Sequence, residues 1–97
     1  MKSVGKYLQL LTVYMQTHAS VYHIKRMGIF GSVARGEQTE DSDIDIFYEG
    51  EALNLFTLAH IKYELETLLE CPVDLVRVRE RMDEFLKQTI QKEAIYV

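Results

Sequence analysis

The sequence predicts an α/β (α+β) domain in which a small mixed β-sheet carries helices packed on one face. Segments with helix and strand patterns alternate in the order helix, strand, strand, helix, strand, helix. The chain has 97 residues, so residues 1–97 are expected to form a single domain with a modest core. Its composition, 47% hydrophobic and 27% charged residues, is that of an ordinary globular protein.

The first part of the chain is predicted to contain a helix, a strand and one helical turn. Residues 3–16 have apolar side chains at helical spacing, and residues 17–22 are expected to be a connection. A strand over residues 24–30 ends at Gly31, and residues 32–35 follow as a single helical turn. The apolar positions of the helix are Val4, Leu8, Leu11 and Met15.

The second predicted strand, residues 43–48, alternates between two kinds of side chain. One face would carry Asp43, Asp45 and Phe47. The other face would carry Ile44, Ile46 and Tyr48. Because the isoleucines need the face that the helices cover, both aspartates are expected on the open face.

A helix, a strand and a last helix are predicted in the second half of the chain. The helix over residues 54–69 stops before Pro72, which cannot continue it, and a strand rich in β-branched residues follows over 73–78. The last helix covers residues 82–92, and residues 94–97 are expected to pack as a short extended tail. The side chains predicted to point inward from the last helix are Met82, Phe85, Leu86 and Ile90.

Gly31 and Ser32 directly follow the first strand, which is a favourable place for a phosphate group. Glycine lets the backbone approach a phosphate, and the Ser32 hydroxyl and the amides after it can donate to phosphate oxygens. A Gly-Ser pair is also a common turn, so this pair alone does not define a site.

Three aspartates are the second candidate for chemistry. Asp43 and Asp45 would repel each other on one strand face, and a divalent cation such as Mg²⁺ would relieve that repulsion. The alternative is a strand end with solvated acids. Asp74 would lie on the open face because Val73 and Leu75 need the covered one, although it could equally be an edge residue paired with an arginine. If the third strand lies beside the second, the three carboxylates converge and could share two metal ions.

The motifs resemble those of a known family. Gly31-Ser32, ten further residues and Asp43-Ile44-Asp45 resemble the signature of the polymerase-β-like nucleotidyltransferase superfamily, which implies the nucleotidyltransferase fold. Residues 30–37 and 41–46 resemble the minimal nucleotidyltransferase (MNT) group, whose members are often antitoxins of HEPN/MNT toxin–antitoxin pairs. The resemblance covers residues 24–96.

The resemblance implies a role for each aspartate. Asp43 and Asp45 would bind two Mg²⁺ ions and, through them, the triphosphate of ATP. Asp74 would bind the catalytic metal ion and help to deprotonate the acceptor hydroxyl. The implied reaction transfers AMP to a hydroxyl of a partner protein, for which a HEPN-type toxin is expected.

The resemblance also implies phosphate contacts. Gly31 and Ser32 would hold the β- and γ-phosphates, and Arg35 could add positive charge there. Arg35 could instead form a salt bridge with a nearby acid; the candidates are Glu37, Glu40 and Asp41.

Composition narrows the function classes. The net charge of −4 argues against direct DNA binding, and no apolar run approaches the ~20 residues of a membrane span. No signal peptide is evident, so a cytoplasmic protein is expected. Cys71 is a lone cysteine and excludes an internal disulfide. The basic residues Arg77, Arg79 and Arg81 are either solvated or contact a partner or nucleotide.

Because one domain is expected to use nearly all 97 residues, we expect no second domain that could enclose an acceptor. We therefore expect the acceptor to be presented by another protein, or the site to be completed by a second chain in a homo- or hetero-oligomer. Two alternatives to a protein-modifying enzyme remain. One is an antitoxin that acts by binding alone, and the other is a small-molecule nucleotidyltransferase of the aminoglycoside type.

Overall fold

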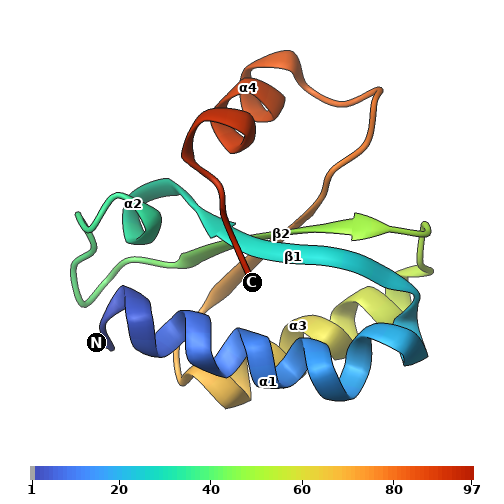
Figure 1. Cartoon of the computed structure of the whole chain (residues 1–97), viewed down its shortest axis with the longest axis horizontal. Coiled ribbons are helices and arrows are strands. Elements are labelled where there is room, and N and C mark those ends of the chain that lie inside the picture. The colour runs from blue at the N-terminus through green and yellow to red at the C-terminus, as the bar shows by residue number, and fades with distance from the viewer. Residues whose placement is uncertain (1) are drawn as a thin grey trace.

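A four-stranded sheet forms the centre of the protein in the computed structural model, which describes residues 2–97 (Figure 1). The strand order is β3-β2-β1-β4. β1 (Ile24–Phe30) and β2 (Ile44–Gly50) are antiparallel, whereas β2 and β3 (Val73–Arg77) are parallel. The short β4 (Ile95–Tyr96) pairs antiparallel with β1. The predicted mixed sheet and the extended C-terminal tail are both confirmed.

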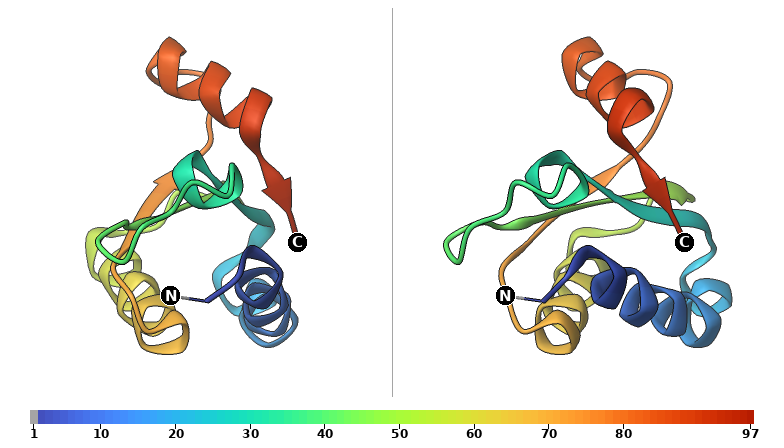
Figure 2. Two further views of the ribbon diagram at one scale, coloured as in Figure 1. Left: turned by 90° about the vertical axis from the view of Figure 1, so that its left-hand side faces the viewer. Right: turned by 60° about the vertical axis from the view of Figure 1, so that its left-hand side comes forward.

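Two long helices, α1 (Val4–Tyr22) and α3 (Leu55–Leu69), lie side by side under one face of the sheet (Figures 1 and 2). The face that they cover carries Ile44, Ile46 and Tyr48 of β2, as the alternation predicts. These side chains are almost completely buried, and burying each stabilises the fold by roughly 1.5–3 kcal/mol. The helices contribute Tyr7, Leu11, Tyr14, Ile61, Leu65 and Leu69 to the same core.

The helix α1 continues six residues beyond its predicted end, so the expected connection over residues 17–22 was wrong. The hydroxyl of Thr17 donates to the carbonyls of Val13 and Tyr14 and thus stays compatible with the helix. Tyr14, His18 and Tyr22 are spaced four residues apart, and their rings stack on one face of the helix. The helix ends only where His23 adopts a left-handed conformation, with φ of 57°.

The helix α4 (Glu84–Glu93) lies over the opposite face of the sheet, which corrects the prediction that all helices share one face (Figure 1). Phe30 and Phe47 point to that face, and Ile90 of α4 packs against them in a second, smaller core. Two large aromatic side chains on the second face need a cover, and α4 supplies it. Phe85, predicted to point inward, is 79% exposed.

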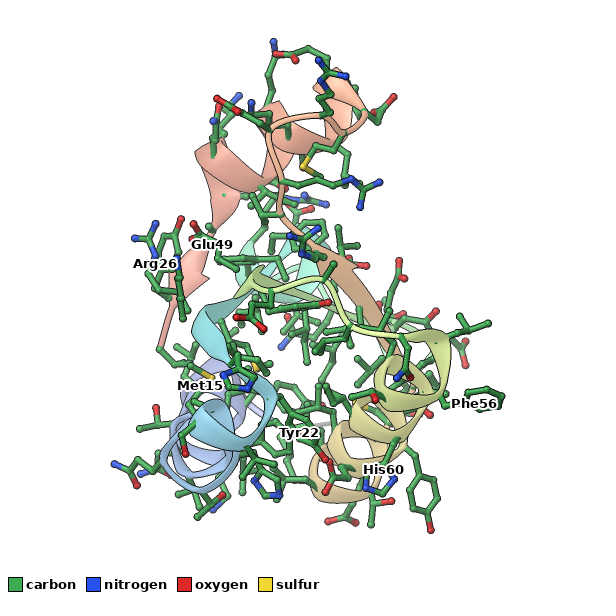
Figure 3. The ribbon with its side chains drawn as sticks, turned by 90° about the vertical axis from the view of Figure 1, so that its right-hand side faces the viewer. Met15, Tyr22, Arg26, Glu49, Phe56 and His60 are labelled. Carbon is green, nitrogen blue, oxygen red and sulfur yellow. The ribbon has the colours of Figure 1, made fainter. Side chains whose placement is uncertain are left out.

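The remaining elements follow the predictions closely. The helical turn α2 spans Gly31–Ala34, and Asp43 lies just before β2 rather than inside it. Asn54 caps α3 by accepting a hydrogen bond from the Thr57 amide. On the antiparallel pair, Arg26 of β1 forms a salt bridge with Glu49 of β2 (Figure 3). Within residues 2–97, no helix has the length and apolar character needed to cross a membrane.

Candidate active site

The parallel pairing of β2 and β3 places two of the predicted acids side by side. Asp45 and Asp74 are direct partners in the register, and Asp43 immediately precedes β2. Parallel neighbours need a long crossover connection, and α3 provides it. Val73 and Leu75 belong to the core beneath the sheet, so Asp74 faces the other side, as predicted. The sheet therefore brings the three aspartates to one region.

The Asp45 carboxylate experiences the negative charges of the other two aspartates. Burial raises the pKa of Asp45, and the negative charges of Asp74 and Asp43 raise it further. The positive charge of Arg35 opposes this shift. Within residues 2–97, no lysine or arginine forms a salt bridge with any of the three aspartates, so the alternative of an arginine-paired Asp74 is not observed.

Gly31 makes room for the Asp45 carboxylate. A Cβ atom at Gly31 would lie 2.2 Å from Asp45 Oδ2, and Gly31 adopts φ of 75°, where only glycine is free of strain. The pairing of Phe30 with Asp45 holds the start of α2 against the start of β2. Gly31, which was predicted to let the backbone approach a phosphate, thus also leaves space for the Asp45 carboxylate. The sequence alone did not predict this second role.

Ser32 is half-buried in the turn α2 beside Gly31. Its carbonyl accepts a hydrogen bond from the Glu37 amide, which fixes the backbone of the turn. No hydrogen bond within residues 2–97 engages its hydroxyl, and Phe30 gives the start of α2 no side-chain cap. The hydroxyl and the amides of this turn are therefore placed to donate to an anion.

Arg35 lies next to the aspartates but is held by two acids. Its guanidinium pairs with Glu37 at 3.1 Å, one of the predicted partners, and with Glu93 of α4 at 2.5 Å. The second contact ties α2 to α4 across the rim of the site. Sequence reasoning missed Glu93, although its position three residues after the buried Ile90 puts it on the inward face of α4.

The donor chemistry of the site fits a hard divalent cation. Neighbouring carboxylates without salt-bridge partners in residues 2–97 are the kind of ligands that Mg²⁺ prefers. Within residues 2–97, no three His, Cys, Asp or Glu side chains are arranged to hold a metal ion on their own. A cation here would therefore need further ligands from water or phosphate, as is usual for Mg²⁺. Asp43, Asp45 and Asp74 remain predicted ligands.

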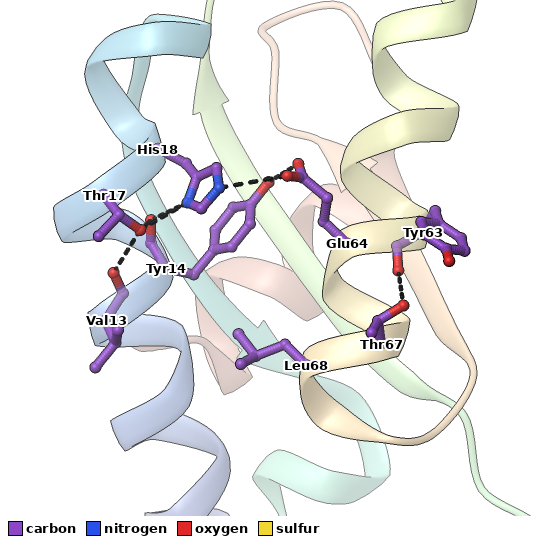
Figure 4. Close-up of a pocket in the computed structure, with 8 residues that line it drawn as sticks. All are labelled: Val13, Tyr14, Thr17, His18, Tyr63, Glu64, Thr67 and Leu68. Carbon is purple, nitrogen blue, oxygen red and sulfur yellow. Dashed lines mark hydrogen bonds and ion pairs between the residues drawn. The ribbon is translucent and has the colours of Figure 1, made fainter.

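A hollow of about 360 Å³ lies between α1 and α3 (Figure 4). Its polar centre is Glu64, which accepts hydrogen bonds from the hydroxyls of Tyr14 and Tyr22, both at 3.0 Å. Glu64 also lies 3.3 Å from His18 Nε2 and 3.6 Å from His60 Nε2. This carboxylate is already satisfied by the protein, so the hollow is a helix–helix junction rather than a reactive site.

A Gly-Ser turn after one strand and acids on two neighbouring strands define the class of nucleotide-transferring domains. The family described as "Nucleotidyltransferase domain" matches residues 14–97, and the chain belongs to this family. It is therefore a nucleotidyltransferase.

Two relatives of similar length support this assignment, and a further structure shares the fold. The protein adenylyltransferase MntA of Thermococcus cleftensis is 33% identical over 89 residues, which cover 91% of this chain and 89% of the relative. A solved structure, provisionally named a minimal nucleotidyltransferase, is 33% identical with a TM-score of 0.75, and the alignment covers 97% of this chain and 95% of the other. A toxin–antitoxin structure with AMP-PNP has the same fold, with a TM-score of 0.77 at 22% identity, covering 91% of this chain and 69% of the other.

Proposed function

We propose that this chain is a Mg²⁺-dependent enzyme that transfers AMP from ATP to a hydroxyl side chain of a HEPN-type toxin and thereby acts as its antitoxin. The pairing of Asp45 with Asp74 across β2 and β3 is the observation that carries the proposal, because it supplies acids for both the nucleotide and the acceptor. The name of the Thermococcus cleftensis relative supports a protein as the acceptor. Structures with a similar fold include a tri-AMPylated HEPN toxin of Shewanella oneidensis in complex with an MNT antitoxin.

Each residue of the site has a proposed task. Asp43 and Asp45 would hold the Mg²⁺ ions and, through them, the triphosphate, and the turn at Gly31 and Ser32 would donate hydrogen bonds to its β- and γ-phosphates. The bound Mg²⁺ ions would supply charge neutralisation at the phosphates and lower the pKa of the attacking hydroxyl. Arg35 must exchange an acidic partner for a phosphate in order to contribute.

The transfer step balances without a further reagent. The acceptor oxygen forms a bond to the α-phosphorus of ATP, and the bond from that phosphorus to the β-phosphate oxygen breaks. Pyrophosphate leaves with the electron pair of the broken bond, and Asp74 receives the proton of the hydroxyl. Asp74 suits this task because it is exposed at an edge of the sheet, where an acceptor can approach it.

The direct test uses ATP labelled at the α-phosphate, Mg²⁺ and the purified HEPN partner. We expect label on the partner, and a loss of at least about 100-fold when Asp43→Asn and Asp45→Asn are combined. Asp41→Asn is the matched control, since Asp41 is an exposed acid two residues before the site. Full neutralisation of the toxin by the double variant would show that binding alone suffices and would refute the enzymatic proposal.

A further inference from the structure

The strand β3, which contains the predicted base Asp74, lies at a free edge of the sheet. It pairs with β2 on one side, and no strand pairs with its other side in residues 2–97. The ladder with β2 uses the Pro72 carbonyl at one end and the Val78 amide at the other. In a parallel pair, every second residue of a strand directs its backbone N–H and C=O groups toward the same neighbour. The backbone groups of Asp74 and Val76 therefore bond to β2. Those of Leu75 and Arg77 therefore point outward and are available to another strand.

A groove follows this edge. One hollow, of about 270 Å³, begins at Asp74 and is lined by Leu55, Leu58 and Lys62 among others. A second, of about 380 Å³, shares Leu58 and Leu75 with the first and continues past Arg77 to Met82 and Leu86. Leu55 is 80% exposed, so the wall of the groove presents apolar surface to solvent.

Among residues 2–97, the groove has more basic than acidic side chains along it, with Asp74 and Asp83 as its acids. Lys62, Arg77 and Arg79 line it, and within residues 2–97 none of them forms a salt bridge with a carboxylate. Arg77 donates to the Gly50 carbonyl and Arg79 to the Arg81 carbonyl, both neutral acceptors. This surface is therefore complementary to an acidic segment although the whole chain has a net charge of −4.

The hydroxyl of Tyr48 gives an independent indication of a ligand. Tyr48 is 1% exposed and lines the second hollow, and its hydroxyl has no hydrogen-bond partner among residues 2–97. A buried hydroxyl without a hydrogen-bond partner is energetically unfavourable. A carboxylate that enters the hollow would accept this hydrogen bond and would also neutralise Arg77 or Arg79.

We propose that an extended acidic segment of the acceptor protein adds to β3 as a fifth strand and thereby presents its hydroxyl to Asp74. Adjacent strands place paired side chains about 4.5–5.5 Å apart on the same face, so a residue paired with Asp74 lies on the catalytic face. Its two chain neighbours point to the other face, toward the apolar wall formed by Leu55 and Leu58. The segment should thus carry a hydroxyl residue between apolar residues, with an acid about three residues away, opposite Arg77.

A second copy of this chain fits the edge less well than an acidic partner does. It would bring another Lys62, Arg77 and Arg79 toward the same cationic groove, and like charges in proximity are unfavourable. The proposal rests on the proposed function, because the hydroxyl at Asp74 has meaning only if the chain modifies a protein.

Hydrogen exchange of the complex with the HEPN partner tests the docking directly, alongside labelling of the partner from ATP. We expect slower exchange of the Leu75 and Arg77 amides on binding, with little change at Asp74 and Val76, whose amides are already bonded. Labelled partner without protection of Leu75 and Arg77 would overturn the docking proposal and leave the enzymatic function intact. Protection without label would refute the enzymatic function and retain the docking surface, and neither signal would refute both.

Charge reversal provides the second measurement. We expect Lys62→Glu combined with Arg79→Glu to raise the KM for the partner at least tenfold while the KM for ATP stays unchanged. Lys6→Glu combined with Lys25→Glu is the control, since both lysines are exposed on α1 and β1 and the net charge changes equally. An equal rise in the KM for the partner in both double variants would overturn the proposal. A dimer of this chain that protects the β3 edge from exchange and excludes the partner would also overturn it.

Discussion

Replacing Gly31 with alanine should damage the site far more than the fold. The new Cβ would lie 2.2 Å from Asp45 Oδ2, whereas ordinary contact begins at 3.4 Å, so the two atoms must separate by about 1.2 Å (3.4 − 2.2). The carboxylate of Asp45 is the mobile partner in this contact. A displacement of about 1 Å in a catalytic group can lower the rate about 100-fold. We therefore expect a loss of transfer activity of about two orders of magnitude.

Gly36→Ala supplies a matched control. Gly36 has φ of 73°, almost the same as the 75° of Gly31, but no atom lies within 4 Å of its Cβ position. Both substitutions force alanine into the left-handed region, at about 1–2 kcal/mol each. For a domain of this size, each kcal/mol lowers Tm by roughly 4–8 °C. The two variants should lose similar stability, and Gly31→Ala alone should lose activity.

The assay combines thermal unfolding with initial rates of AMP transfer at saturating ATP, measured well below both Tm values. Equal activity of the two alanine variants would refute the reasoning, because it would show that the Asp45 carboxylate does not need the space at Gly31. A much lower Tm for Gly31→Ala would show that the contact supports the fold itself.

Three further outcomes follow from the charged groups. Asp45→Asn should raise the free energy of unfolding at neutral pH, since burial and its acidic neighbours raise the pKa of Asp45. Urea titrations should show that this gain disappears below about pH 3.8, where Asp45 is protonated in both the folded and the unfolded protein. Burial and the hydrogen bond to Glu64 raise the pKa of Tyr14, so the free energy of unfolding should fall as pH rises past 10. Urea titrations at about pH 8 and about pH 11 should show a smaller decrease for Tyr14→Phe than for the unchanged protein. Arg35→Ala should raise the KM for ATP while Glu37→Ala does not; unchanged KM values for both would limit Arg35 to its salt bridges.

The arrangement of the candidate site in the fold was largely predictable because most of its parts are local in sequence. Gly31 and Ser32 follow an apolar strand directly, and the alternation around Asp43 and Asp45 assigns their face without knowledge of the neighbours. The position of Asp74 depended on which strand pairs with β2, and that pairing is confirmed by the register. The close contact between the Asp45 carboxylate and Gly31 could not be predicted, because it depends on atomic distances between two strand ends.

The errors in the fold arose where distant contacts decide the structure. The second half of α1 has weak helical character in sequence, but Tyr14, His18 and Tyr22 lie on one face and meet Glu64 of α3, fifty residues after Tyr14. Such a polar tertiary contact overrides local propensity. The periodicity of α4 identified Ile90 as buried but could not say which face of the sheet it covers, since that depends on its packing against the aromatic side chains of Phe30 and Phe47.

The parallel pairing of β2 with β3 has a consequence for the order in which the protein matures. β1 and β2 are neighbours in the chain, so the Gly-Ser turn can meet Asp45 through short-range pairing. Asp74 joins them only after α3 has formed and the chain has returned to the sheet, and such long-range pairing is the slower event in folding. During refolding, the affinity for nucleotide should therefore appear before the capacity to activate an acceptor.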